Sequence, residues 1–564
     1  MRTTKIFESV HLKNKLIILG IILYPFLFIW QGGDLTDSGY FAYNYSVFFE
    51  NLHKFNFSSL MIFLDFCGAW CLKIFPFIIG LNILFILFLL ATCFVVFLIL
   101  KDYYQNKTVL LFGILAGELF AIRYNSLMFN YDISSILFLL LSMLFIIKGL
   151  SKGKYGYLFL GGCFSMIAIL FRISDVLIVV CVPLFFIFEH YKFNTEKLEK
   201  NRLKLVQKVF IYWAGSVAVI LVFLIFLYLY GLLDVYFKSI FLDSKALIQN
   251  KYIKFSFDEL ITFVYYFFGL GFLIFIYSKF AINRLKEVIF VLFILFISYF
   301  LFRNFSYTNP IKYVVPAFFL WVVLFVFLDS SLIEIRNKYQ HLLLIGSLIT
   351  LIQVAGTNTG IFQKMCFGFM FLIPLMVLLM NEINDYTLFK LTIDWKKVVR
   401  FFLSFILFIC LILRFGWIFH VGAGIGIRMK STYPIEHSFM KGIYTTKENS
   451  FYINSLTTSI KRNSNETQPI LIYGHQPLFY YLSERKPCVK YIWLKGIDLN
   501  PDVFLNELSN SINNNKQYPL IINTKEFVLG NNFETKMISF LKKNKYEIIE
   551  ETARYSIWKH SSSK

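Results

Sequence analysis

Residues 78–100 have the sequence IIGLNILFILFLLATCFVVFLIL, which contains no charged side chain. About 20 consecutive apolar residues are enough for an α-helix to cross a lipid bilayer. This stretch therefore predicts a transmembrane helix, and the segments on either side of it repeat the pattern.

Similar apolar segments occur along the first 420 residues. Together they predict a polytopic α-helical membrane protein with about 13 transmembrane helices. No small-residue cleavage site follows the first segment, so we expect a retained span and not a signal peptide. The other predicted spans lie at 15–30, 108–124, 133–148, 157–171, 176–190, 209–230, 260–278, 288–302, 311–328, 342–355, 361–380 and 401–419.

Composition agrees with a membrane protein and excludes other classes. Of the 564 residues, 58% are hydrophobic and 16% are charged, and the mean hydropathy is +0.65. A disordered chain could not carry so much apolar surface, and soluble domains contain about 25% charged residues. The net charge of +21 does not indicate a nucleic-acid partner here, because Lys and Arg collect in the cytoplasmic loops of membrane proteins. The spacing of the eight Cys fits neither a zinc site nor a disulfide framework.

The distribution of Lys and Arg predicts the topology. With a cytoplasmic N-terminus, the cytoplasmic loops hold about three times as many Lys and Arg as the outer loops. An odd number of spans then places residues 421–564 outside the cytoplasm. This tail alternates strand and helix patterns, which predicts a small α/β domain with a mostly parallel sheet. The expected strands are 469–473, 489–494, 519–523, 547–551 and 554–559, and the expected helices are 477–483, 501–512 and 533–543.

The first outer loop, 31–77, is unusually long. Tyr40, Tyr43, Val47 and Phe48 repeat at three- and four-residue spacing, which predicts a helix in the membrane interface with its Tyr side chains near the headgroups. Residues 60–75 and the loop at 231–259 show similar patterns and are further candidates for interfacial helices.

An acidic motif precedes the first of these helices. Residues 32–40 read GGDLTDSGY and place Asp34 and Asp37 three residues apart at the predicted outer surface. Asp is a preferred helix N-cap, and the pair resembles a capping box. A carboxylate facing a water-filled cavity could equally act as a general base or a metal ligand. The two roles do not exclude each other.

Further ionisable residues lie at the same predicted membrane level. Asp132 opens a span, where it could cap the helix. Arg172 and Asp175 lie in a short outer turn and could simply form an ion pair, although Arg at the end of an apolar helix is also a good phosphate ligand. Glu118 lies inside a span, which makes it a functional candidate. The other basic candidates, which could bind phosphate or extend to the interface, are Arg123, Arg303 and Lys312.

These features resemble the GT-C membrane glycosyltransferases, in particular the bacterial glycosyltransferase family 39-like branch that includes protein O-mannosyltransferases and aminoarabinose transferases. The first loop carries the Asp-x-Gly-Tyr pattern at 37–40, and Asp132 opens the fourth span. Residues 161–175 match a Gly-rich helix ending in a basic residue, here Arg172. Residues 472–483 (IYGHQPLFYYLS) resemble the strand-turn-helix of the outer domain of these relatives.

The resemblance implies a transferase in the bacterial inner membrane that uses a polyprenyl-phosphate sugar donor and inverts the anomeric centre. Its acceptor would be a lipid, a glycan or a protein. Asp37 would deprotonate the acceptor hydroxyl, although the sequence has Asp-Ser at 37–38 where many relatives have Asp-Glu, which leaves Asp34 open as the base. Tyr40 belongs to the same motif, and Asp132 would orient the acceptor, an Arg or a divalent ion; the metal stays unassigned because relatives differ in metal dependence. The leaving phosphate would be stabilised by Arg172 together with Arg123, Arg303 or Lys312.

The alternatives are a surface-polysaccharide polymerase or ligase and a lipid-linked sugar flippase. Polymerases and ligases usually carry their large outer loop between late spans, whereas the outer bulk here follows residue 420. A flippase needs no outer α/β domain and would favour charges along a central path. The expected division is therefore a GT-C-like catalytic module at 1–420 and an outer domain at 421–564.

Overall fold

The computed structural model describes most of the chain. Predicted span 288–302, Arg303, and parts of the loop at 231–259 and of span 260–278 lie outside the described residues. The described residues are 2–50, 61–123, 127–193, 198–238, 240, 258–271, 311–328, 332–354, 361–383, 386–388, 391–393, 395–419, 425–489, 492, 501–515, 517–525 and 531–563.

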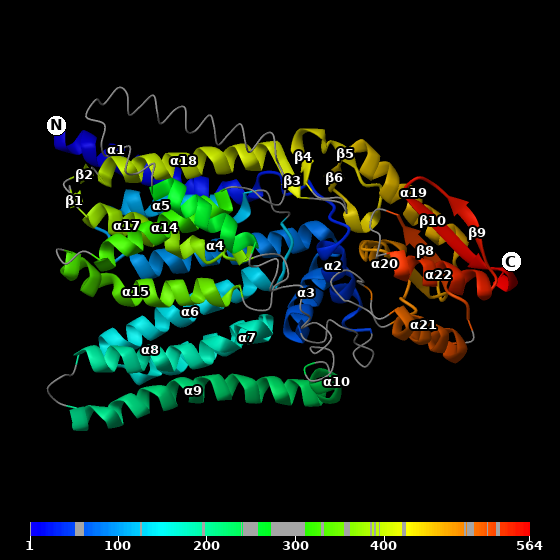
Figure 1. The fold of residues 1–564 in the computed structure, drawn as a ribbon, viewed down its shortest axis with the longest axis horizontal. Coiled ribbons are helices and arrows are strands. Elements are labelled where there is room, and N and C mark those ends of the chain that lie inside the picture. The colour runs from blue at the N-terminus through cyan, green and yellow to red at the C-terminus, as the bar shows by residue number, and fades with distance from the viewer. Residues whose placement is uncertain are drawn as a thin grey trace.

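Long helices run roughly side by side along the molecule, and the C-terminal strands and helices cover one end of them (Figure 1). The predicted α-helical architecture is confirmed. The helices of this bundle are α1 (Arg2–Leu23), α4 (Ile78–Leu100), α5 (Lys107–Ile122), α6 (Tyr131–Lys152), α7 (Tyr155–Phe171), α8 (Ile178–Phe193), α9 (Leu198–Leu229), α14 (Ile311–Leu328), α15 (Ile333–Ile352), α17 (Phe369–Glu382) and α18 (Trp395–Gly416).

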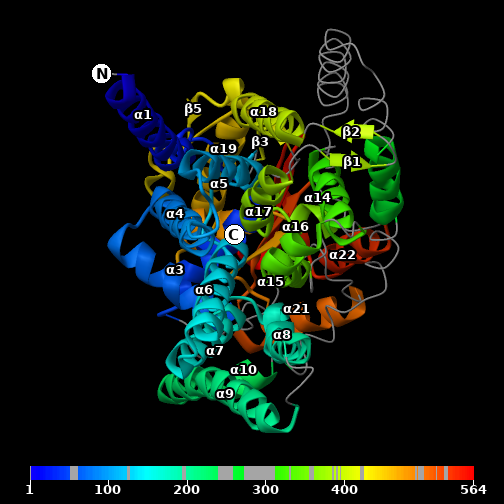
Figure 2. The ribbon, with the colours of Figure 1, turned by 90° about the vertical axis from the view of Figure 1, so that its left-hand side faces the viewer.

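Helix α17 forms the centre of the bundle. Every residue from Phe369 to Met380 is buried, and Figure 2 shows α17 enclosed by its neighbours. Gly113 and Gly117 of α5 allow α5 to pack closely on α17, because a Cβ at either position would lie 3.0 Å from the backbone of α17.

Among the described residues, three helices are both long and apolar enough to cross a bilayer unaided: α4, α6 and the Lys204–Leu229 part of α9. The total number of spans stays a prediction.

The segment 361–380, predicted as one span, is broken. A single helical turn, α16 (Ile361–Lys364), is followed by an irregular stretch before α17 begins. At the break, a Cβ on Gly368 would lie 2.8 Å from the Cα of Thr350 in α15. The close packing of α15 against the break requires Gly there.

The first loop contains the two expected helices, but the first of these helices is covered by protein and does not lie among lipid headgroups. Helix α2 (Asp37–Val47) and helix α3 (Ile62–Ile74) lie next to each other. Tyr40, Tyr43 and Tyr45 are all buried, and α2 packs on α20 (Leu478–Ser483) of the C-terminal segment. The expectation that these Tyr side chains lie among lipid headgroups is therefore wrong, since protein covers them. From the other candidate loop, the described part contains the short helix α10 (Leu233–Lys238).

The C-terminal segment is built on a four-stranded sheet of order β7-β8-β10-β9. Among the described strands, the β7–β8 pair alone is parallel, while β8–β10 and β10–β9 are antiparallel. The expectation of a mostly parallel sheet is wrong, because the last two strands form a hairpin, which is necessarily antiparallel. The elements of this core are β7 (Ile470–Tyr473), α21 (Pro501–Asn515), β8 (Leu520–Thr524), α22 (Asn531–Lys543), β9 (Tyr546–Glu551) and β10 (Tyr555–His560).

Two features of this segment were not expected. Helix α19 (Lys447–Asn463) has no counterpart among the predicted elements. Where a strand was expected at 489–494, the described residues show only an isolated bridge between Ile470 and Pro487 just before it. Short two-stranded pairs complete the fold: β1 (Tyr386–Leu388) with β2 (Leu391–Ile393), β3 (Trp417–Phe419) with β4 (Ile425–Ile427), and β5 (Tyr433–Pro434) with β6 (Tyr444–Thr445).

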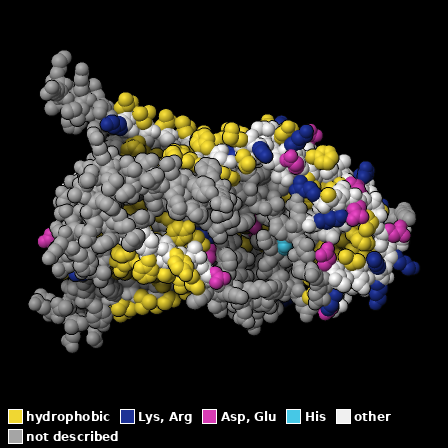
Figure 3. Space-filling view, turned by 45° about the horizontal axis from the view of Figure 1, so that its top comes forward, with side chains coloured by type: hydrophobic (Ala, Val, Ile, Leu, Met, Phe, Trp, Pro, Cys, Tyr) yellow, Lys and Arg dark blue, Asp and Glu magenta, His cyan; other side chains and the backbone are white. Residues whose placement is uncertain are grey.

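Surface chemistry follows this division of the fold. On the face shown in Figure 3, hydrophobic side chains line the helical part, whereas Lys, Arg, Asp and Glu gather over the C-terminal segment. Exposed apolar residues on helices are what a lipid-facing surface requires.

Candidate functional site

The start of α6 carries the centre of the candidate site. Asn130, not Asp132, caps this helix: its Oδ1 accepts hydrogen bonds from the backbone N–H of Asp132 at 3.0 Å and of Ile133 at 3.3 Å. Because Asn130 satisfies the free N–H groups at the helix start, the carboxylate of Asp132 is available for side-chain contacts.

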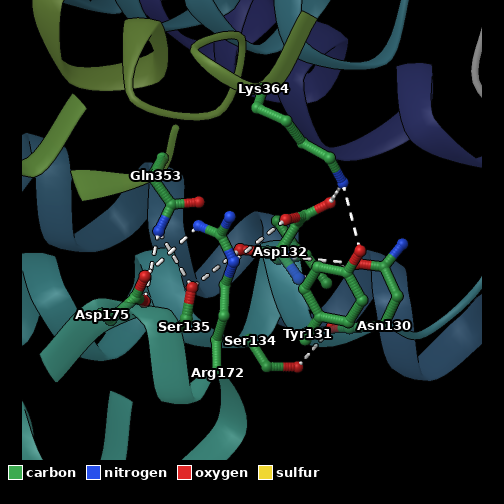
Figure 4. Close-up of polar contacts among 10 residues, drawn as sticks. Asn130, Tyr131, Asp132, Ser134, Ser135, Arg172, Asp175, Gln353 and Lys364 are labelled. Carbon is green, nitrogen blue, oxygen red and sulfur yellow. Dashed lines mark hydrogen bonds and ion pairs between the residues drawn. The ribbon is translucent and has the colours of Figure 1, made fainter. Parts of the chain in front are cut away.

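Asp132 lies between two cations from distant parts of the chain (Figure 4). Its Oδ2 accepts a hydrogen bond from Lys364 Nζ at 2.5 Å, and its Oδ1 lies 3.7 Å from Nε of Arg172. Lys364 also contacts the hydroxyl of Tyr131 at 3.4 Å. Lys364 is thus a largely buried cation whose charge is paired with a carboxylate.

The network continues from Arg172 to the turn η3 (Ile173–Leu177) and to α15. Arg172 Nη1 donates to Oδ1 of Asp175 at 3.2 Å, as expected for the pair in this turn. Gln353 Nε2 donates to Ser135 Oγ at 3.0 Å and lies 3.5 Å from Oδ2 of Asp175. Burial raises the pKa of Asp175 from its ordinary value to about 7, partly offset by the Arg172 charge. Two cations and two carboxyls thus share one buried cluster.

The two acidic residues of the first loop have different surroundings. Asp34 is buried, and its carboxylate accepts hydrogen bonds from Thr36 N at 3.0 Å, Thr36 Oγ1 at 2.7 Å and Ser38 N at 2.9 Å. These bonds hold the turn before α2, where Thr36 and not Asp34 occupies the N-cap position. Asp37, the first residue of α2, is exposed. Of the two carboxylates, only that of Asp37 is open to solvent.

Asp37 lies near the Asp132 network. Phe41 lies one helical turn beyond Asp37, and its ring packs on the ring of Tyr131 at a centroid distance of 5.9 Å. The Asp37 charge also acts electrostatically on Tyr131. Since Tyr131 touches Lys364 and lies 5.7 Å from the Arg172 guanidinium, the structure brings Asp37, Asp132 and Arg172 together.

Lys312 belongs to a neighbouring buried pair. Its Nζ donates to Oε1 of Glu259 at 2.8 Å, and Oε2 of Glu259 accepts the backbone N–H of Ile361 at 2.7 Å. Ile361 is the first residue of α16, the turn that ends at Lys364. Glu259 therefore fixes the start of the turn that delivers Lys364 to Asp132.

The remaining candidates lie elsewhere. Arg123 is fully buried at the end of α5, where its Nη1 contacts Phe120 O at 2.9 Å and Cys366 Sγ at 3.0 Å. Glu118 is fully buried within α5, and Tyr40 is buried on α2. Within the described ranges, no group of three His, Cys, Asp or Glu side chains could hold a metal ion.

Sequence reasoning missed three members of the site: Lys364, Gln353 and Glu259. Lys364 and Gln353 flank the junction between two apolar segments, where a lone polar residue has no distinctive spacing. Glu259 precedes an apolar segment and carries no motif. Only the tertiary structure brings them to Asp132 and to α16.

The overall architecture is similar to that of a solved bacterial structure. ArnT from Cupriavidus metallidurans in the apo state superposes with a TM-score of 0.51 at 10% identity, over 98% of both chains. The chain has a GT-C fold. The structure of the same ArnT bound to undecaprenyl phosphate gives a TM-score of 0.50 at 10% identity, again over 98% of both chains. No protein-family model and no curated protein matches the sequence. The similarity to ArnT confirms the GT-C resemblance of the short motifs at the level of the fold alone.

Proposed function

We propose that this GT-C protein transfers a sugar from a polyprenyl-phosphate donor to an acceptor at the outer face of the membrane, with inversion at the anomeric carbon. One observation carries the proposal: an exposed carboxylate, Asp37, lies beside a buried network that holds the cations Lys364 and Arg172. The ArnT structure with undecaprenyl phosphate supports a lipid phosphate as the ligand of such a fold.

Lys364 and Arg172 are the proposed ligands of the donor phosphate. In the structure their charges are balanced by Asp132 and Asp175. A phosphate would compete with these carboxylates for the same N–H donors, and Arg offers it a planar fork while Lys offers a point charge. The leaving group is a phosphate, so it needs charge stabilisation more than it needs a proton.

Asp37 is the proposed general base. Its carboxylate would accept the proton of the acceptor hydroxyl while the hydroxyl oxygen attacks the anomeric carbon. The bond from the anomeric carbon to the phosphate oxygen then breaks, and polyprenyl phosphate leaves. Asp34 is not assigned this role, because three hydrogen bonds already hold its carboxylate in the loop.

The proposed orientation places the N-terminus in the cytoplasm of a bacterium and the catalytic face outside its inner membrane. The catalytic module is then 1–420, and the outer domain is 421–564. Packing of α20 on α2 supports this arrangement, because it joins the C-terminal segment to the loop that carries Asp37. A lipid, a glycan or a protein could be the acceptor.

The test is mass spectrometry of surface glycolipids and glycoproteins from a deletion strain. We expect one sugar to disappear and to return when the wild-type gene is supplied. Asp37→Asn should fail to restore it, whereas the matched control Asp102→Asn, at an exposed residue after α4, should restore it fully. If no sugar is lost, the proposed function is wrong. If Asp37→Asn restores the sugar at equal protein level, Asp37 is not the base. Unchanged transfer with impaired lipid translocation would indicate a flippase.

A further inference from the structure

A second buried polar cluster lies where α1, α18 and the C-terminal segment meet. Arg428 begins the turn η6 (Arg428–Lys430), and only 1% of its surface is exposed. Its Nη1 donates to Oε1 of Gln31 at 3.0 Å, and its guanidinium lies 4.6 Å from the ring centre of Phe28. These contacts hold the guanidinium plane in one orientation.

Much of the hydrogen-bonding capacity of this cluster is unused. Nε and Nη2 of Arg428 and Oγ of Ser431 are buried and have no hydrogen-bond partner in the described part of the chain. Ser431 is itself 1% exposed. A buried N–H or O–H without a partner costs free energy, and more so on a charged group. Three such donors converging on one turn therefore indicate a missing acceptor.

The charge of Arg428 is also unbalanced. No acidic side chain in the described ranges forms an ion pair with it, and a second buried cation, Arg414 of α18, lies nearby. Arg414 Nη2 donates to Leu27 O at 3.1 Å and its Nη1 to Ile122 O at 3.4 Å. Burial and, next, the Arg414 charge lower the pKa of Arg428 to about 8. Glu118, on the adjoining helix α5, is fully buried, and neither of its carboxyl oxygens has a hydrogen-bond partner in the described part of the chain, so it does not pair with Arg428.

The position of the cluster suggests which anion would fit. Large apolar side chains are exposed around it: Leu27, Trp30, Ile427 and Met429. An exposed Trp is typical of the membrane–water interface, where lipid phosphates lie. In both ribbon views α1 and α18 lie at the top of the molecule, whereas α6 and α7 of the candidate active site lie in its lower half (Figures 1 and 2).

We propose that Arg428, Ser431 and Gln31 form a binding site for a phosphate group, separate from the candidate active site. The planar fork of Arg428 would supply Nε and Nη2 to two phosphate oxygens, and Ser431 would donate a third hydrogen bond. The phosphate belongs either to the headgroup of an outer-leaflet phospholipid or to free inorganic phosphate. The ligand would bind where the C-terminal segment meets the loop after α1, since Gln31 of that loop also donates to Ser431 O at 3.1 Å.

The test uses the full-length protein in a maltoside detergent, which contains no phosphate. Native mass spectrometry with added phosphatidylglycerol and equilibrium binding of radiolabelled inorganic phosphate are the two arms. We expect saturable binding in one of them. Loss of charge-assisted hydrogen bonds in Arg428→Gln should weaken it roughly ten- to a hundredfold, and Arg428→Lys should weaken it less. Arg462→Gln, at an exposed Arg of the same segment, is the control and should bind as the wild type does.

The two arms identify the source of the phosphate. Retention of one phospholipid with weak binding of inorganic phosphate assigns the site to a lipid headgroup, and the reverse assigns it to a free anion. If Arg428→Gln does not fold, Ser431→Ala, which removes one neutral donor, should still weaken binding several-fold. Absence of saturable binding by the wild type in both arms, or equal binding by the wild type and the variants at positions 428 and 431, would overturn the proposal.

Discussion

Two variants that break the ion pair between Lys364 and Asp132 are expected to lower the free energy of unfolding by different amounts, depending on which partner is replaced. Both side chains are largely buried, with exposed fractions of 13% and 9%, and their charged atoms are 2.5 Å apart. Removing one partner of a buried pair typically destabilises a protein by about 3–5 kcal/mol, because the other charge is left buried. In Lys364→Met, Asp132 keeps Arg172 at 3.7 Å, so we expect about 3 kcal/mol.

Asp132→Asn should cost more. Lys364 would keep only the hydroxyl of Tyr131, at 3.4 Å, and Arg172 would lose one of its two carboxylate partners. We expect about 5 kcal/mol for this change. The double variant removes both charges at once, so its cost should be at least about 2 kcal/mol smaller than the sum of the two single costs.

Unfolding of the purified protein in mixed micelles, by titration with SDS, measures these differences. Lys338→Met is the matched control, because its pair with Glu382 is half exposed on the Lys side and should contribute less than about 1 kcal/mol. Additive costs for Lys364 and Asp132, or equal costs for Lys364→Met and Lys338→Met, would refute the assignment of a buried, coupled pair.

Four further outcomes are expected. Asp37→Asn should lower sugar transfer about 10²–10⁴-fold at unchanged protein abundance, measured with a polyprenyl-phosphate sugar in membranes; a normal rate would remove Asp37 as the base. Arg172→Lys should keep partial transfer while Arg172→Gln loses roughly ten- to a hundredfold in donor affinity, and a donor titration that is unchanged in Arg172→Gln would contradict the phosphate role. Because the pKa of Asp175 is raised to about 7 in the folded protein, folding binds a proton there, so stability should fall as pH rises from about 5 through 7; Asp175→Asn should remove this dependence in thermal unfolding across that range, and an unaltered pH profile would count against it. Gly39→Ala should lower both stability and abundance, because the new Cβ would lie 2.3 Å from the backbone N of Leu478, and wild-type abundance of this variant would show that the α2–α20 contact tolerates a shift.

The sequence was informative where a pattern is local. Uninterrupted apolar runs predicted α4 and α6, and strand and helix periods predicted most of the C-terminal elements. Asp132 and Arg172 could be selected because each lies at the outer end of a predicted span, where Arg is a good phosphate ligand, and because both match positions of the GT-C pattern. That Asp34 holds a turn while Asp37 is open could not be predicted, because both fit a capping pattern equally well.

The predictions that failed concern features that depend on contacts between residues far apart in the sequence. The break between α16 and α17 is not visible in an apolar run, because it follows from the packing of Gly368 against α15. Lys364 therefore seemed to be an ordinary residue at the start of a span. The Tyr side chains of α2 show the same limit: their period predicted a helix correctly, but only the position of α20 determines that protein and not lipid covers them.

The contacts of the first loop also constrain when this loop can reach its final structure during synthesis. Gly32 N donates to Tyr444 O at 3.0 Å, and Leu478 N donates to Leu35 O at 3.2 Å, so the loop before Asp37 is held by residues made several hundred positions later. Bacterial and eukaryotic ribosomes add about 5–20 residues per second, which leaves the loop without these partners for roughly 20–90 s after it has been made. During that interval α2 has no α20 to cover its Tyr side chains, and a chain cut short before residue 444 never acquires the support. The first loop therefore reaches the structure described here only after the C-terminal segment has been made.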